Sequence, residues 1–111
     1  MRARVVHLLV DDRPDGEDFA VNVQALLGPI DGEGEESFQV TVCTPGWLLA
    51  NLPMPKGLVF LRHHLVVERR DEALVEQAIR GLCLRTEGPD WTTVAAKLSR
   101  YGYWEFEDYR E

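Results

Sequence analysis

Acidic and aromatic side chains gather in two short segments of this sequence, and together they could bind a protein partner. One is the polar connector of residues 31–36, and the other is the run of residues 103–109, where aromatic and acidic residues are interleaved. Tryptophan and tyrosine are enriched at binding hot spots, and a row of carboxylates steers a basic partner. We therefore expect a contact surface for a basic protein. Its candidate contacts are Glu33, Glu35, Glu36, Trp104, Glu105, Glu107 and Asp108.

Each segment also has a purely structural interpretation. The aromatic residues near the end of the chain could pack on a sheet as its last strand with the acids in water, which is compatible with binding. The connector resembles the start of a calcium loop, because Asp31, Glu33 and Glu35 stand at alternate positions. A calcium loop, however, needs glycine at its sixth position and glutamate at its twelfth, where this chain has Glu36 and Val42. The connector is therefore interpreted as the tip of a hairpin.

Groups that could catalyse a reaction are scattered along the chain. Asp11 and Asp12 follow an apolar run, but adjacent side chains of an extended segment point in opposite directions, so a turn is the simpler interpretation. His63 and His64 are neighbours on an expected strand and should face opposite sides, and His7 is isolated. We expect no metal site, no cofactor and no enzyme. The alternative is a small ligand-binding or hydrolytic domain that uses the two aspartates and the histidines.

The net charge of the chain is unevenly distributed. The 111 residues contain 12 Lys and Arg against 19 Asp and Glu, a net charge of −7. Residues 1–36 carry −6 and residues 103–111 carry −3, whereas the middle of the chain is slightly positive at +2. Nucleic-acid binding usually needs a basic face, so direct binding to DNA or RNA is not expected. The acidic ends favour a local feature that faces a partner.

The sequence also bears on compartment. The apolar run from Val5 to Val10 is too short for a secretory signal, and no stretch approaches the ~20 apolar residues of a membrane span. We therefore expect a cytoplasmic protein without membrane contact. Cys43 and Cys83 lie in apolar segments and are expected to be two buried thiols, although the sequence alone leaves a bridge between them open.

Hydrophobic periodicity predicts the elements that must position these residues. Alternation of apolar and polar residues indicates strands over 19–27 and 38–43, which should form an antiparallel hairpin with the acidic connector at its tip. Apolar runs predict two more strands at 5–10 and 58–67, and Pro45 can begin a short helix. Two longer helices should follow caps at Asp71 and Asp90, ended by Gly88-Pro89 and by Gly102 respectively.

This order of elements predicts the fold class. We expect one α+β domain over residues 1–111, with an antiparallel sheet of about four strands and two C-terminal helices packed on one face.

Two contiguous runs of this sequence resemble a known family. The run from Gly34 to Leu48, GEESFQVTVCTPGWL, is similar to the core signature of the immunity protein 8 family. The ending KLSRY at 97–101, followed by WEFEDY at 104–109, resembles the same family. Segments between these runs match in order, so that the resemblance covers nearly the whole chain.

The resemblance implies a function. The family belongs to bacterial polymorphic toxin systems, so the chain would be a small non-enzymatic protein that binds a cognate toxin domain and occludes its active site. Many such toxins are nucleases with basic clefts, which the acidic segments could occupy. A different possibility is a subunit of a larger assembly, in which the aromatic residues mediate contacts between identical chains; the sequence leaves the oligomeric state open.

Overall fold

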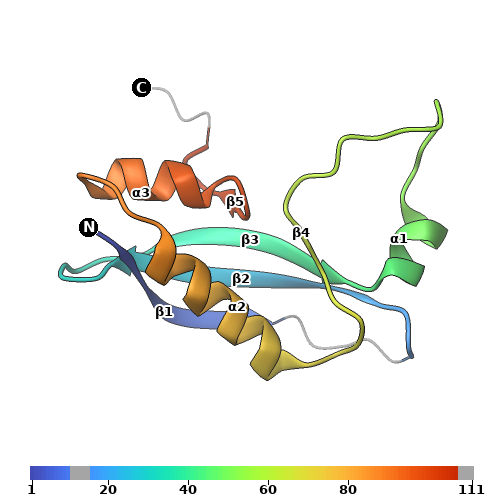
Figure 1. Cartoon of the computed structure of the whole chain (residues 1–111), viewed down its shortest axis with the longest axis horizontal. Helices are drawn as coiled ribbons and strands as arrows, with labels where there is room; N and C mark the ends of the chain where they lie inside the picture. Colours follow the sequence, from blue (N-terminus) through green and yellow to red (C-terminus); the bar gives the residue numbers. More distant parts are fainter. Residues whose placement is uncertain (11–15, 108–111) are drawn as a thin grey trace.

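The computed structural model describes residues 1–10 and 16–107 of the chain. A five-stranded sheet forms the body, with the strand order β1-β2-β3-β4 and with β5 also paired to β3 (Figure 1). The elements in chain order are β1 (Ala3–Val10), β2 (Ala20–Pro29), β3 (Glu36–Cys43), α1 (Pro45–Asn51), β4 (His64–Val66), α2 (Glu72–Arg85), α3 (Trp91–Leu98) and β5 (Tyr103–Trp104). The α+β class is confirmed.

The predicted hairpin forms the centre of the sheet. β2 and β3 pair antiparallel from Ala20↔Cys43 to Leu27↔Glu36, and β1 adds to the other side of β2. Alternate residues of β2 are buried on one face because a strand has a side-chain period of two. These residues, with their counterparts on β1 and β3, form the core, which includes Ala3, Val21, Val23, Ala25, Leu27, Phe38 and Val42.

Helices α2 and α3 cover that apolar face (Figure 1). Both N-caps are as predicted: the Asp71 carboxylate accepts a hydrogen bond from the Leu74 backbone N–H, and that of Asp90 accepts one from Thr93. Helix α2 ends at Arg85, with Thr86 as its C-cap, which is earlier than Gly88-Pro89 predicts. The short helix α1 stands between β3 and β4, so the helices are not all C-terminal.

The strand predicted over 58–67 is wrong for most of its length. Only His64–Val66 forms a strand, and it runs parallel to β3 with Thr41 opposite His64. A longer β4 in this register would place Leu61 and Arg62 opposite Phe38 and Gln39, but β5 occupies those two positions. Leu61 and Arg62 therefore have no free strand edge to join, and the pairing with β3 begins only at His63, whose carbonyl accepts a hydrogen bond from the Thr41 N–H. The sheet is consequently mixed and has five strands, one more than expected.

A last strand forms as the structural interpretation of the aromatic segment predicts, and of its aromatic residues Trp104 packs against the core, whereas Tyr103 and Phe106 are exposed. Tyr103 pairs with Gln39 and Trp104 with Phe38, in antiparallel register. Gly102, expected as a helix stop, serves instead as a close-approach residue, because a Cβ there would lie 3.2 Å from the Cβ of Phe38. The C-cap of α3 is Ser99.

Both cysteine thiols are buried and free. Cys43 is fully buried on β3, and Cys83 is buried on the inner side of α2. Removal from water disfavours the thiolate, so burial raises the pKa of Cys43 and raises that of Cys83 to about 11. These thiols therefore behave as small apolar core residues.

Candidate functional site

The pairing of β5 with β3 brings the two predicted acidic segments together. Glu36 begins β3 directly after the hairpin tip, and Trp104 and Glu105 stand at the end of β5. We call this region the tip–tail surface and define it by Glu33, Glu35, Glu36, Trp104 and Glu105. Residues about 70 positions apart in sequence thus form one surface at one end of the sheet.

Trp104 joins the two halves of the tip–tail surface. Its indole N–H donates a 2.8 Å hydrogen bond to the Glu36 carboxylate. Its ring stacks on Phe38, with the ring centres 6.1 Å apart and the planes at 7°, and Phe106 meets the ring edge-on. Because the ring packs against the core while its N–H holds Glu36, Trp104 anchors the tail and orients one carboxylate of the tip.

Glu105 is hydrogen-bonded to strand β3 both by its backbone and by its side chain. Its carboxylate accepts a 2.7 Å hydrogen bond from the Ser37 backbone N–H, and its own N–H donates to the Ser37 carbonyl at 3.0 Å. A backbone N–H is a weak counter-group compared with a cation, so the negative charge stays available to a partner. Glu105 is exposed to solvent.

Glu33 and Glu35 extend this acidic surface along the hairpin tip. Both are exposed, and no ion pair in the described part of the chain involves either of them. Gly34 between them has φ +94°, a left-handed conformation that glycine adopts without strain. Gly28 lies beneath, where a Cβ would be 2.2 Å from the Gly34 carbonyl oxygen. The two glycines thus fix the backbone that carries these carboxylates.

Of the two remaining predicted contacts, only Glu107 lies within the described residues, and it is engaged elsewhere. The Glu107 carboxylate forms an ion pair with Arg62. In this pair the Glu107 side chain is largely buried, with 15% of it exposed. Asp108 lies outside the described residues. Glu107 is therefore a bridge between the tail and the segment before β4.

The structure does not bring His7 of the catalytic alternative together with His63 and His64. His7 lies on β1, whereas His63 and His64 lie at β4, and β2 and β3 stand between these two strands in the sheet. Asp11 and Asp12 fall outside the described residues. Among residues 1–10 and 16–107, no group of three or more potential metal ligands is found. The geometry gives the hydrolytic alternative no support.

Sequence reasoning missed a cleft under the helices. It has a volume of about 390 Å³ and opens between the sheet, α2, α3 and the residues before β4. Its floor and walls are apolar, and its rim carries cations and two histidines. The cationic and histidine residues are Arg62, His63, His64, Arg85 and Arg100. These residues come from three separate segments, so their spacing in the sequence could not predict that they lie close together in the fold.

An exposed apolar loop borders this cleft. Residues 58–61 read Leu-Val-Phe-Leu, and the Phe60 side chain is 97% exposed. Figure 1 shows the segment between α1 and β4 running out beyond the sheet. Leu61 of this loop also lines the cleft, so exposed apolar residues adjoin it along the chain. Monomeric proteins seldom leave such a surface uncovered.

Comparison with known families decides the class of protein. The family model described as immunity protein 8 matches residues 8–109, which is nearly the whole chain. The chain belongs to the immunity protein 8 family. This membership, predicted from the two runs, places it among the immunity proteins of toxin–immunity systems. Neither the search of curated proteins nor the search of solved structures gave a match.

One further property concerns membranes. None of the helices in the described residues combines the length and the apolar character needed to cross a bilayer.

Proposed function

We propose that this immunity protein binds a cognate toxin domain and blocks its active site through the tip–tail surface. The observation that carries the proposal is the register of β5 on β3, which places Trp104 opposite Phe38 and so joins the two acidic segments. A surface assembled from both ends of the charge distribution is a better electrostatic target than either segment alone.

The arrangement suits recognition of a basic active site. Glu33 and Glu35 project from the hairpin tip, and Glu105 lies beside the start of β3. Carboxylates at such positions can take the place of substrate phosphates in the basic cleft of a nuclease. Contacts between opposite potentials speed the encounter and fix the orientation of the two proteins. A nuclease domain is therefore the kind of toxin that we propose as the partner, with Glu107 and Asp108 as further candidate contacts.

The mode of action is steric and requires no catalysis by the immunity protein. Covering the toxin's cleft excludes its substrate for as long as the complex lasts, so a slow dissociation rate is the quantity that protects the cell. We propose that the protein acts in the cytoplasm of the producing cell, where the toxin would otherwise reach its substrate.

Co-expression tests this function. A toxin-domain reading frame found next to the gene should arrest growth when it is expressed alone, and co-expression of this chain should restore growth. Expression of an unrelated immunity protein is the control. Growth arrest that persists despite stable, folded immunity protein would contradict the proposal.

A further inference from the structure

The cleft bordered by α2, α3 and β4 has the composition of a binding site rather than of a packing defect. Its floor is formed by core-facing residues of the hairpin, Leu27 and Phe38 among them, and Ala78 and Leu82 of α2 form one wall. A volume of about 390 Å³ falls in the range of ligand pockets and exceeds what one large apolar side chain needs. The apolar floor therefore accommodates an apolar group from outside the chain.

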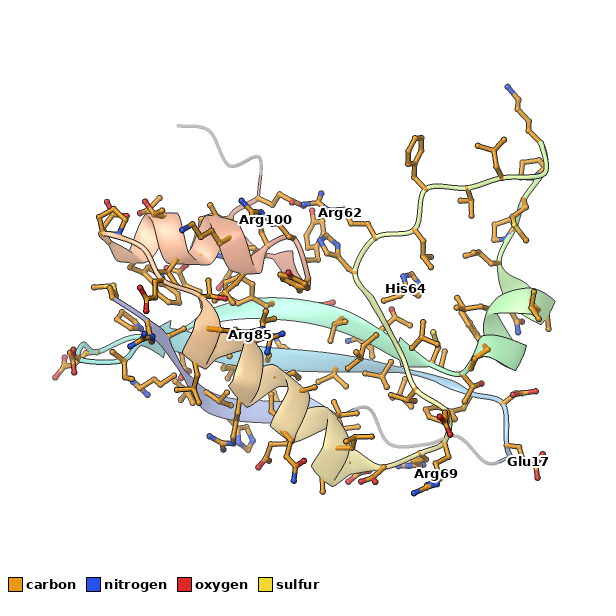
Figure 2. The ribbon with its side chains drawn as sticks, in the orientation of Figure 1. Glu17, Arg62, His64, Arg69, Arg85 and Arg100 are labelled. Carbon is orange, nitrogen blue, oxygen red and sulfur yellow. The ribbon has the colours of Figure 1, made fainter. Side chains whose placement is uncertain are left out.

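The rim defines the charge of that group. Arg85 extends from α2 on one side, and Arg62 and Arg100 lie beside the end of α3 on the other (Figure 2). Arg62 already binds the chain's own Glu107 and donates to the Ser99 carbonyl at 3.2 Å. In the described residues, no carboxylate pairs with Arg85 or Arg100. Two guanidinium groups thus stand over an apolar cleft, ready for a carboxylate.

We propose that this cleft is an anchor site for the toxin. It receives one apolar side chain, of leucine or phenylalanine size, from a toxin segment whose neighbouring carboxylate binds Arg85 and Arg100. The proposal rests on the toxin-binding function given above and adds a second contact of opposite charge to the acidic tip–tail surface. Binding hot spots are enriched in arginine and cluster in well-packed, desolvated pockets, which suits an apolar anchor beside these guanidinium groups.

A protein segment fits this site better than a small molecule or a second copy. Next to Leu61, which lines the cleft, the chain exposes Phe60, which does not line it and which a ligand confined to the cleft would leave uncovered. A second copy that inserted its own exposed 58–61 loop would bring the flanking Lys56 and Arg62 to the cleft. Those cations would meet the cationic rim and repel it.

Substitutions at exposed cleft residues test the proposal without disturbing the core. Ala78→Phe places a ring at the wall of the cleft, and Ala73→Phe on the same helix is the matched control, since Ala73 does not line the cleft. The double change Arg85→Glu with Arg100→Glu reverses the rim charge. Arg69→Glu with Arg80→Glu reverses as much charge elsewhere. Circular dichroism verifies that each variant is folded.

Titration calorimetry measures the affinity of each variant for the cognate toxin domain. We expect Ala78→Phe and the double arginine variant each to weaken binding at least tenfold, with both controls close to wild type. The fluorescent apolar anion anilinonaphthalene sulfonate should bind the free protein, be displaced by the toxin and be lost in Ala78→Phe.

Three outcomes would overturn the proposal and are distinguishable. If both folded cleft variants bind the toxin as wild type does, the anchor site is wrong while the toxin-binding function stands. If wild type itself does not bind, the proposed function fails, and the toxin is excluded as the occupant. A concentration-dependent dimer that Ala78→Phe abolishes, measured by sedimentation, would assign the cleft to a second copy.

Discussion

The indole N–H of Trp104 donates a hydrogen bond of 2.8 Å to the carboxylate of Glu36, a residue 68 positions earlier in the chain. This bond connects the last strand to the hairpin tip, while the stacking of the same ring on Phe38 fixes both to the core. The half-buried Trp104 side chain thus links the two halves of the tip–tail surface, beside the bonds that join Glu105 to Ser37.

Trp104→Ala should lower the free energy of unfolding by about 2 to 3 kcal/mol, because it removes the stacked ring and leaves a space beside Phe38. Trp104→Phe retains a smaller ring but loses the hydrogen bond to Glu36 and part of the stacked surface, at a cost of about 1 to 2 kcal/mol. Urea unfolding followed by circular dichroism measures both. Equal stability of the alanine variant and wild type would show that β5 does not anchor the tail.

Gly28→Ala should destabilise the hairpin and displace its acidic tip. The new Cβ would lie 2.2 Å from the backbone carbonyl oxygen of Gly34, a contact that only movement of the connector can relieve. The cost should be about 1 to 3 kcal/mol, together with weaker toxin binding.

Gly81→Ala is the matched control for this substitution. Its Cβ would meet only the Arg85 side chain, at 3.3 Å, and alanine favours a helix over glycine by about 1 kcal/mol. The midpoint temperature of thermal unfolding should therefore fall for Gly28→Ala and should stay the same or rise for Gly81→Ala. The opposite order would be inconsistent with the tip geometry.

Cys83 should be much less reactive in the folded protein than in the unfolded chain. Burial raises its pKa to about 11 from an ordinary value of 9.0, so little thiolate is present at mildly alkaline pH. Since the unfolded thiol ionises first, stability contributed by this group is full below pH 9 and is lost as the pH rises from there to about 11.

Iodoacetamide labelling read by mass spectrometry checks this prediction. Labelling of Cys83 should be slow in native buffer and fast in urea, and Cys43 should behave in the same way, because burial also raises its pKa. Rapid labelling of Cys83 in the native protein would contradict the burial of α2 against the sheet.

Added salt should weaken the complex with the toxin. Contacts between exposed charges are screened over a Debye length of about 8 Å at physiological ionic strength, so the association rate should fall as salt is added. Surface plasmon resonance at several salt concentrations measures this dependence. An association rate that is insensitive to salt would leave no role for the carboxylates.

The sequence predicted those elements whose information is local. Alternation over 19–27 and 38–43 predicted the hairpin, and the carboxylates of Asp71 and Asp90 predicted where two helices begin. It predicted a strand at 58–67 because an apolar run looks the same whether or not a sheet edge is free to pair with it. That edge is occupied by β5, a two-residue strand too short to show any periodicity.

Part of the candidate site could likewise be predicted from the sequence, and part could not. The acidic and aromatic residues could be found from composition, but their proximity depends on the long-range pairing of Trp104 with Phe38. The cleft could not be found from the sequence, because its lining comes from the hairpin, both long helices and the segment around His63. His63 itself has a left-handed φ of 64°. Only the folded chain brings Arg62, Arg85 and Arg100 to one rim.

The central claim is that the tip–tail surface binds the toxin, and calorimetric affinity of a triple variant tests it most directly. Glu33→Gln, Glu35→Gln and Glu105→Gln together remove three exposed charges. The control, Glu17→Gln, Glu68→Gln and Glu76→Gln, removes as many elsewhere, and Glu17 lies at the opposite end of the sheet (Figure 2). At about 0.2 to 1 kcal/mol for each exposed contact, the test variant should bind roughly 3-fold to 100-fold more weakly. The control should match wild type. Equal affinity of the test variant, the control and wild type would contradict the claim.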